Sequence, residues 1–109
     1  MEFKLENISL VQEQNGYIKL KAETGICRIT VTKIPKDISN ITLEVSNWNA
    51  DRIEGLSVFN DETEIDMLHS DPPKVNVNVK SGVLKVDFTK EGMQEIKPGS
   101  VIQLIAYYL

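Results

Sequence analysis

VNVNVKSGVLKVDF, residues 75–88, decides the fold class of this 109-residue chain. Valine alternates with a polar residue up to Ser81-Gly82, and an alternating apolar row resumes after that dipeptide. A period of two is typical of a strand with one buried face, and a glycine-containing dipeptide between two such runs favours a tight turn. The stretch therefore predicts a β-hairpin, and we expect five of its side chains to lie in the core: Val77, Val79, Leu84, Val86 and Phe88.

The same period recurs along most of the remaining chain, with Asn15-Gly16 as a second strong turn signal. The phase of the alternation changes once, between Phe3 and Ile8, which predicts a bulge near Glu6-Asn7. No window of ten residues shows a convincing helical period. We therefore expect an all-β fold of eight or nine short strands, forming a single antiparallel β-sandwich domain over residues 1–109. The pattern leaves an immunoglobulin-like and a jelly-roll strand order equally open.

Charge and composition exclude several classes of function. Sixteen acidic and 12 basic residues give a net charge of −4, whereas a nucleic-acid binder needs a basic surface to displace counterions from phosphates. The N-terminus alternates apolar and charged residues, which is not the pattern of a signal peptide. No apolar run is long enough to span a membrane. We expect a protein made in the cytoplasm, without nucleic-acid or membrane partners.

Residue types that carry catalysis or bind metals are scarce. With one cysteine, Cys27, and one histidine, His69, the chain lacks the three or four ligands of a structural zinc site. Ser70 and Asp71 follow His69, but side chains adjacent in a loop diverge and rarely form a catalytic triad. The acidic residues at positions 62, 64 and 66 alternate along a predicted strand and form a row, not a calcium cage. We expect no enzyme, metal or cofactor, and an inert Cys27 thiol beside apolar neighbours.

One polar connection has the composition of a sugar-binding loop. It contains the only tryptophan, and small β-sandwich lectins combine an aromatic ring with nearby amide, carboxylate and guanidinium groups. A carbohydrate-binding module centred on this loop is therefore an alternative function, with a glycan as the partner. Its candidate ligand-binding residues are Asn47, Trp48, Asn49, Asp51 and Arg52.

The final strand, residues 101–108, is apolar on nearly every residue. Alternate residues Ile102, Leu104, Ala106 and Tyr108 can fill the core, but an ordinary sandwich strand leaves its opposite face wet. That opposite face has two explanations: an interface with another chain, or an internal surface covered by residues 90–99. The predicted interface residues are Val101, Ile105, Tyr107 and Leu109.

The chain also resembles a class of viral proteins in its solvent-facing residues and in its final strand. Its strands face solvent with asparagine, lysine and glutamate, and residues 97–108 (KPGSVIQLIAYY) close the domain on a strand. In these respects it resembles the small β-sandwich accessory proteins of tailed phage virions, such as capsid-decoration and fibre domains. The resemblance implies a non-enzymatic structural or interaction module. Such a module would assemble with itself, as a homo-oligomer, or with a larger particle such as a virion.

Overall fold

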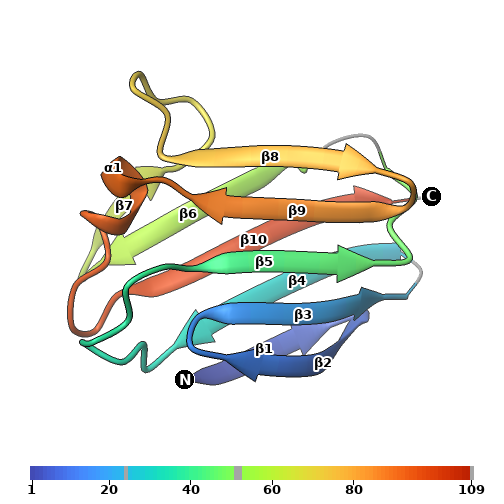
Figure 1. The fold of residues 1–109 in the computed structure, drawn as a ribbon, viewed down its shortest axis with the longest axis horizontal. Helices are drawn as coiled ribbons and strands as arrows, with labels where there is room; N and C mark the ends of the chain where they lie inside the picture. Colours follow the sequence, from blue (N-terminus) through green and yellow to red (C-terminus); the bar gives the residue numbers. More distant parts are fainter. Residues whose placement is uncertain (24, 51–52, 109) are drawn as a thin grey trace.

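The computed structural model describes residues 1–23, 25–50 and 53–108, and in these ranges it contains ten strands in two five-stranded sheets (Figure 1). Sheet A has the strand order β1 (Glu2–Glu6), β4 (Gly25–Thr32), β10 (Val101–Tyr108), β6 (Gly55–Asn60), β7 (Thr63–Asp66). Sheet B has the order β2 (Ile8–Gln14), β3 (Tyr17–Ala22), β5 (Thr42–Ser46), β9 (Val83–Phe88), β8 (Val75–Lys80).

The hydrophobic core lies between the two sheets. Alternate residues of each central strand point inward, and the intervening residues point outward. On β3, for example, Ile18, Leu20 and Ala22 are buried while the residues between them are exposed. Both sheets contribute large, completely buried side chains, among them Ile18, Leu20, Ile29, Leu43, Leu56, Leu84, Ile102 and Leu104. The all-β prediction is therefore confirmed.

The expected strand count was too low because the phase change at Asn7 is a switch between sheets and not a bulge. The strand β1 belongs to sheet A and β2 to sheet B, so the predicted first strand is two strands. Asn7 makes the connection with φ of 59°, a left-handed conformation that asparagine tolerates, and its Nδ2 donates to the carbonyl of Ile26 at 2.6 Å. The bulge lies further on, between Leu10 and Gln12 of β2.

The sheets are not purely antiparallel, which corrects the predicted antiparallel sandwich. Strands β3 and β5 are hydrogen-bonded neighbours in parallel, from Tyr17 opposite Thr42 to Lys21 opposite Ser46. Between them the chain crosses to sheet A, forms β4 and returns, so β5 enters sheet B in the direction of β3. Alternation along one strand carries no information on the direction of its neighbour, so this pairing could not be predicted from it.

Both predicted tight turns are present. Asn15 and Gly16 have φ values of 53° and 89°, and Ser81 and Gly82 have 53° and 75°. Two consecutive positive φ values define the turn whose twist matches that of two antiparallel strands. Gly16 also permits a close approach, because a Cβ there would lie 2.0 Å from the carbonyl oxygen of Asn40.

The prediction for the core residues of the 75–88 hairpin is wrong at Val77. Leu84, Val86 and Phe88 are buried and Val79 is half-buried, but Val77 is 41% exposed. The strand β8 is the outermost strand of sheet B, and the corresponding outer strand of sheet A, β7, has only four residues. Val77 can therefore point toward the space between the sheets and still have few side chains of the opposite sheet over it.

Residues 90–99 close one end of the space between the sheets (Figure 1). They begin with the short helix α1 (Lys90–Met93), whose N-cap Thr89 accepts from the amide of Gly92 at 3.1 Å and donates to the carbonyl of Pro73 at 2.6 Å. The middle of the segment is held by Asn60, whose Nδ2 donates to the carbonyl of Glu95 at 3.0 Å. Among the residues that the structure describes, no helix has the length and hydropathy to cross a membrane.

Candidate functional site

The two faces of β10 differ as its sequence predicts. Ile102, Leu104 and Ala106 are buried at 1%, 0% and 0% exposure, so this part of the core prediction is confirmed. Val101 and Ile105 are half-buried on the opposite face of sheet A. Of the other two predicted interface residues, Tyr107 lies on β10 opposite Ile26, and Leu109 lies outside the described residues.

The neighbouring strands add two apolar residues that the sequence analysis missed. Ile26 of β4 is 45% exposed and precedes the inward row that begins at Cys27. Phe59 of β6 is half-buried and lies opposite Val101. Alternation along each strand could have found both, because each adjoins a residue that points into the core. We call the outward-facing residues Ile26, Phe59, Val101 and Ile105 the apolar stripe.

The backbone leaves an opening beside the stripe. Ile105 lies opposite Gly55 of β6, and a Cβ added at Gly55 would meet no atom within 4 Å. One flank of Ile105 therefore faces a position without a side chain.

Polar residues interrupt the middle of this face. Gln103 lies between Val101 and Ile105, with Thr30 and Ser57 on either side, and Arg28 of β4 lies directly opposite Ile105. Outward residues of β10 from Val101 to Ile105 are uncharged. On the β1 side, the Glu6 carboxylate is 3.5 Å from the Arg28 guanidinium. On the β7 side, Glu64 accepts from the hydroxyl of Ser57 at 2.9 Å. Protein–protein interfaces commonly combine apolar side chains with polar ones, as this face does.

The outer face of sheet B has the opposite character. Register places Lys19, Glu44 and Lys85 side by side across its three inner strands β3, β5 and β9. The hydroxyl of Tyr17 donates to the Glu44 carboxylate at 2.5 Å, and this bond raises the pKa of the Tyr17 phenol. Thr42 similarly donates to Asp87 at 2.8 Å. Charged residues thus lie across the middle of this face, which favours its contact with solvent.

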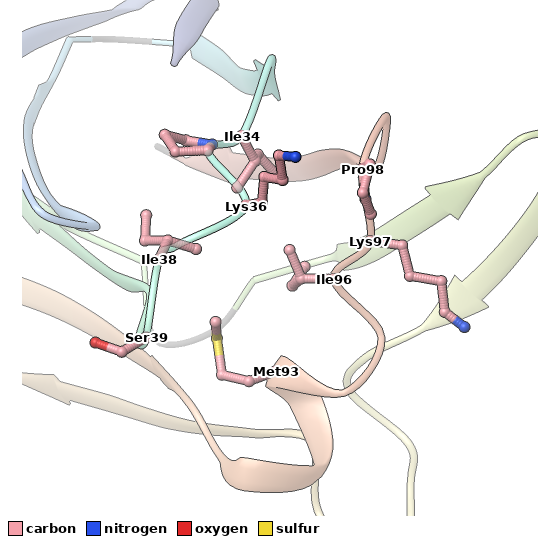
Figure 2. A pocket seen from close by; sticks show the side chains of 9 residues that line it. Ile34, Lys36, Ile38, Ser39, Met93, Ile96, Lys97 and Pro98 are labelled. Atoms are coloured by element: carbon pink, nitrogen blue, oxygen red, sulfur yellow. The ribbon is translucent and has the colours of Figure 1, made fainter.

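Residues 90–99 do not cover the stripe. Figure 2 shows Met93 and Ile96 from this segment facing Ile34 and Ile38, across a cavity at the end of the two sheets. Its volume of about 140 Å³ is below the roughly 300–1,000 Å³ of ordinary ligand pockets. The segment thus packs against the connection between β4 and β5, and the internal-cover explanation of the outward β10 residues loses its structural basis.

The predicted sugar-binding loop lacks an exposed tryptophan. Trp48 is only 3% exposed, and its amide donates to the carbonyl of Gly82 at 2.9 Å. Asn47 turns the chain at φ of 58° and donates from Nδ2 to the carbonyl of Ala22 at 3.0 Å. Asn49 is exposed, whereas Asp51 and Arg52 lie outside the described residues. A buried indole cannot stack on a sugar ring, so the Trp48-centred site is not supported.

The histidine segment forms an exposed pair and not a triad. His69 Nδ1 is 2.7 Å from an Asp66 carboxylate oxygen, and this hydrogen bond is the main reason that the pKa of Asp66 is lowered. A second hydrogen bond, from the amide of Leu68 at 2.9 Å, lowers it further. The Ser70 hydroxyl donates to the carbonyl of Asp66 at 3.2 Å and so is turned toward the backbone. In the described part of the chain, no group of three or more metal-ligating side chains occurs.

Cys27 is buried at 0% exposure and forms no disulfide. Burial raises the pKa of its thiol to about 11, because the interior disfavours the thiolate.

Comparisons with known proteins give no matching family model, no matching curated protein and no matching solved structure.

Proposed function

We propose that this protein is a non-enzymatic structural module that assembles with other protein chains through the outer face of sheet A. The observation that carries the proposal is the apolar stripe on and beside the central strand β10, where Arg28, the charged residue opposite Ile105, is paired with Glu6. A central strand that were merely solvated would present polar groups, as the middle of sheet B does.

Two further features support this function. Arg28, which lies opposite Ile105, is already paired with Glu6, so binding a partner need not bury that charge alone. The strand that carries Ile105 is hydrogen-bonded to a neighbour on both sides, so its outer face is held rigidly. A rigid face loses little conformational entropy on binding.

The two packed sheets suit this role as well. We infer that they form a β-sandwich of the immunoglobulin-like or jelly-roll type. The resemblance to phage accessory proteins suggests a particle of repeated subunits, with the protein as a capsid-decoration or fibre component. Self-association into a homo-oligomer uses the same chemistry, because both partners would bury apolar area.

The test compares two exposed apolar positions by replacing each with lysine. Ile26→Lys places a charge in the stripe, and Val11→Lys places one on β2, where Val11 is 63% exposed. The native mass of each variant and of the wild type is measured by sedimentation over a wide concentration range, with circular dichroism to confirm folding. We expect the wild type and Val11→Lys to reach a larger native mass than Ile26→Lys, which loses the contact through the stripe.

A wild type that stays monomeric throughout would reject self-assembly through this face. Equal association of all three proteins would show that any contact lies elsewhere. Loss of association in the Val11 variant alone would move the interface to β2.

A further inference from the structure

The strand β8 has an unusually open edge. Of the four edge strands in the described structure, β1 carries Glu2, Lys4 and Glu6, β2 is interrupted by a bulge, and β7 has only four residues. Charges, bulges and short length are the usual protections against edge-to-edge pairing. In contrast, β8 pairs with β9 over six residues without a register shift and is uncharged from Val75 to Val79.

The unpaired backbone groups of β8 can be identified from its neighbours. The amide of Thr89 donates to the carbonyl of Lys74 at 2.9 Å, so position 74 faces β9. The amide of Phe88, opposite Val75, instead donates to the carbonyl of Ile41 at 3.0 Å, so Val75 is not bonded across the hairpin. Because the pattern alternates in an antiparallel pair, the amides and carbonyls of Val75, Val77 and Val79 point to the open edge.

The residues at this edge form a palindrome, Val-Asn-Val-Asn-Val, from position 75 to position 79. Two copies aligned antiparallel with Val77 opposite Val77 would also place Val75 opposite Val79. All the backbone groups that point outward then meet, which forms about six hydrogen bonds in three pairs. Side chains match too: valines meet on the core side, and Asn76 meets Asn78 on the outer side.

We propose that β8 pairs with β8 of a second copy of this chain and joins two B sheets into one. The exposure of Val77, 41% in the single chain, has its explanation here, because the facing valines of the partner would cover it. The register also brings Lys80 near Lys74 of the second copy, and Lys74 is already 3.7 Å from the Glu95 carboxylate. This contact uses a different surface from the apolar stripe and does not depend on it.

The test is a register-specific cross-link. Asn76→Cys and Asn78→Cys are each prepared alone and then mixed under mild oxidation, with Cys27 left in place because it is buried. Directly opposed residues of a non-hydrogen-bonded pair have Cβ atoms close enough for a disulfide, whereas diagonal neighbours do not. We expect cross-linked dimer from the mixture and little from either variant alone.

A second pair of variants tests the contact without cysteine. Val77→Lys should remove the dimer and leave the fold intact, because this exposed edge position tolerates a charge, while Val77→Thr keeps a β-branched side chain and should retain it. Dimerisation is followed by sedimentation and by protection of the amides at 75, 77 and 79 from hydrogen exchange. Unprotected amides at the highest soluble concentration would overturn the proposal, as would efficient cross-linking of Asn78→Cys with itself, which requires another register.

Discussion

Alanine substitutions at two adjacent residues of β10 should lower the free energy of unfolding by different amounts, because the two side chains lie on opposite faces of the strand. Leu104 is completely buried between Ile29 of β4 and Leu56 of β6, whereas its neighbour Ile105 is half-buried on the outer face. Leu104→Ala removes three carbon groups, worth about 0.8 kcal/mol each in transfer free energy, and leaves a cavity that adds a further cost. We expect a loss of about 3–4 kcal/mol in the free energy of unfolding.

Ile105→Ala removes the same number of carbon groups from a partly solvated position. Water can fill the space beside Gly55, so the cavity cost disappears and the expected loss is about 1 kcal/mol. Urea denaturation measures both values by linear extrapolation, and an unchanged slope would show that the unfolded states are comparable.

The comparison is run at several protein concentrations, because association would add apparent stability to the wild type. Equal losses for the two variants would refute the two-face description. In that case Ile105 would be packed as tightly as Leu104, and the stripe would be an internal surface.

Three further outcomes follow from buried positions. The Cys27 thiol, with its pKa raised to about 11, should react with a thiol reagent at neutral pH only as fast as the protein unfolds, and rapid labelling of the native protein would contradict its burial. Phe88→Ala should cost about 3–5 kcal/mol in chemical denaturation, and a loss under about 1 kcal/mol would mean that the ring is not packed. Gly92→Ala should destabilise the protein, because a Cβ there would lie 1.9 Å from the carbonyl oxygen of Lys74. Gly55→Ala, which meets no atom within 4 Å, is its control and should leave the melting temperature nearly unchanged.

Local signals explain what could be predicted from the sequence. The turns at Asn15-Gly16 and Ser81-Gly82 depend on φ values that these residue types accept readily. The division of β10 into a buried row and an outward row follows from the pleat of the strand, which needs no knowledge of its partners. For the same reason, half of the candidate interface could be named before the fold was known.

Non-local pairing explains the rest. Val77 alternates as a core residue should, but the position of β8 at the edge of sheet B depends on the order of all five strands. Trp48 lies in a segment of polar composition, yet the hydrogen bond from its amide to Gly82 holds it beside a hairpin far along the chain. The residues next to Val77 and Trp48 in the sequence indicate neither the position of β8 in sheet B nor the contact between Trp48 and Gly82.

The two proposed surfaces would work together if both form. Residues that oppose each other in an antiparallel pair project to the same side of the sheet, so the two-fold axis of a β8–β8 dimer would run perpendicular to sheet B. Both A sheets would then lie on one side of the dimer, and the stripe residues Ile26 and Ile105 of each copy would point in the same direction. A dimer would thus present two equivalent apolar faces to a surface of repeated subunits. Once one face is bound, the second would bind at a high effective concentration, so a weak single contact could support stable attachment.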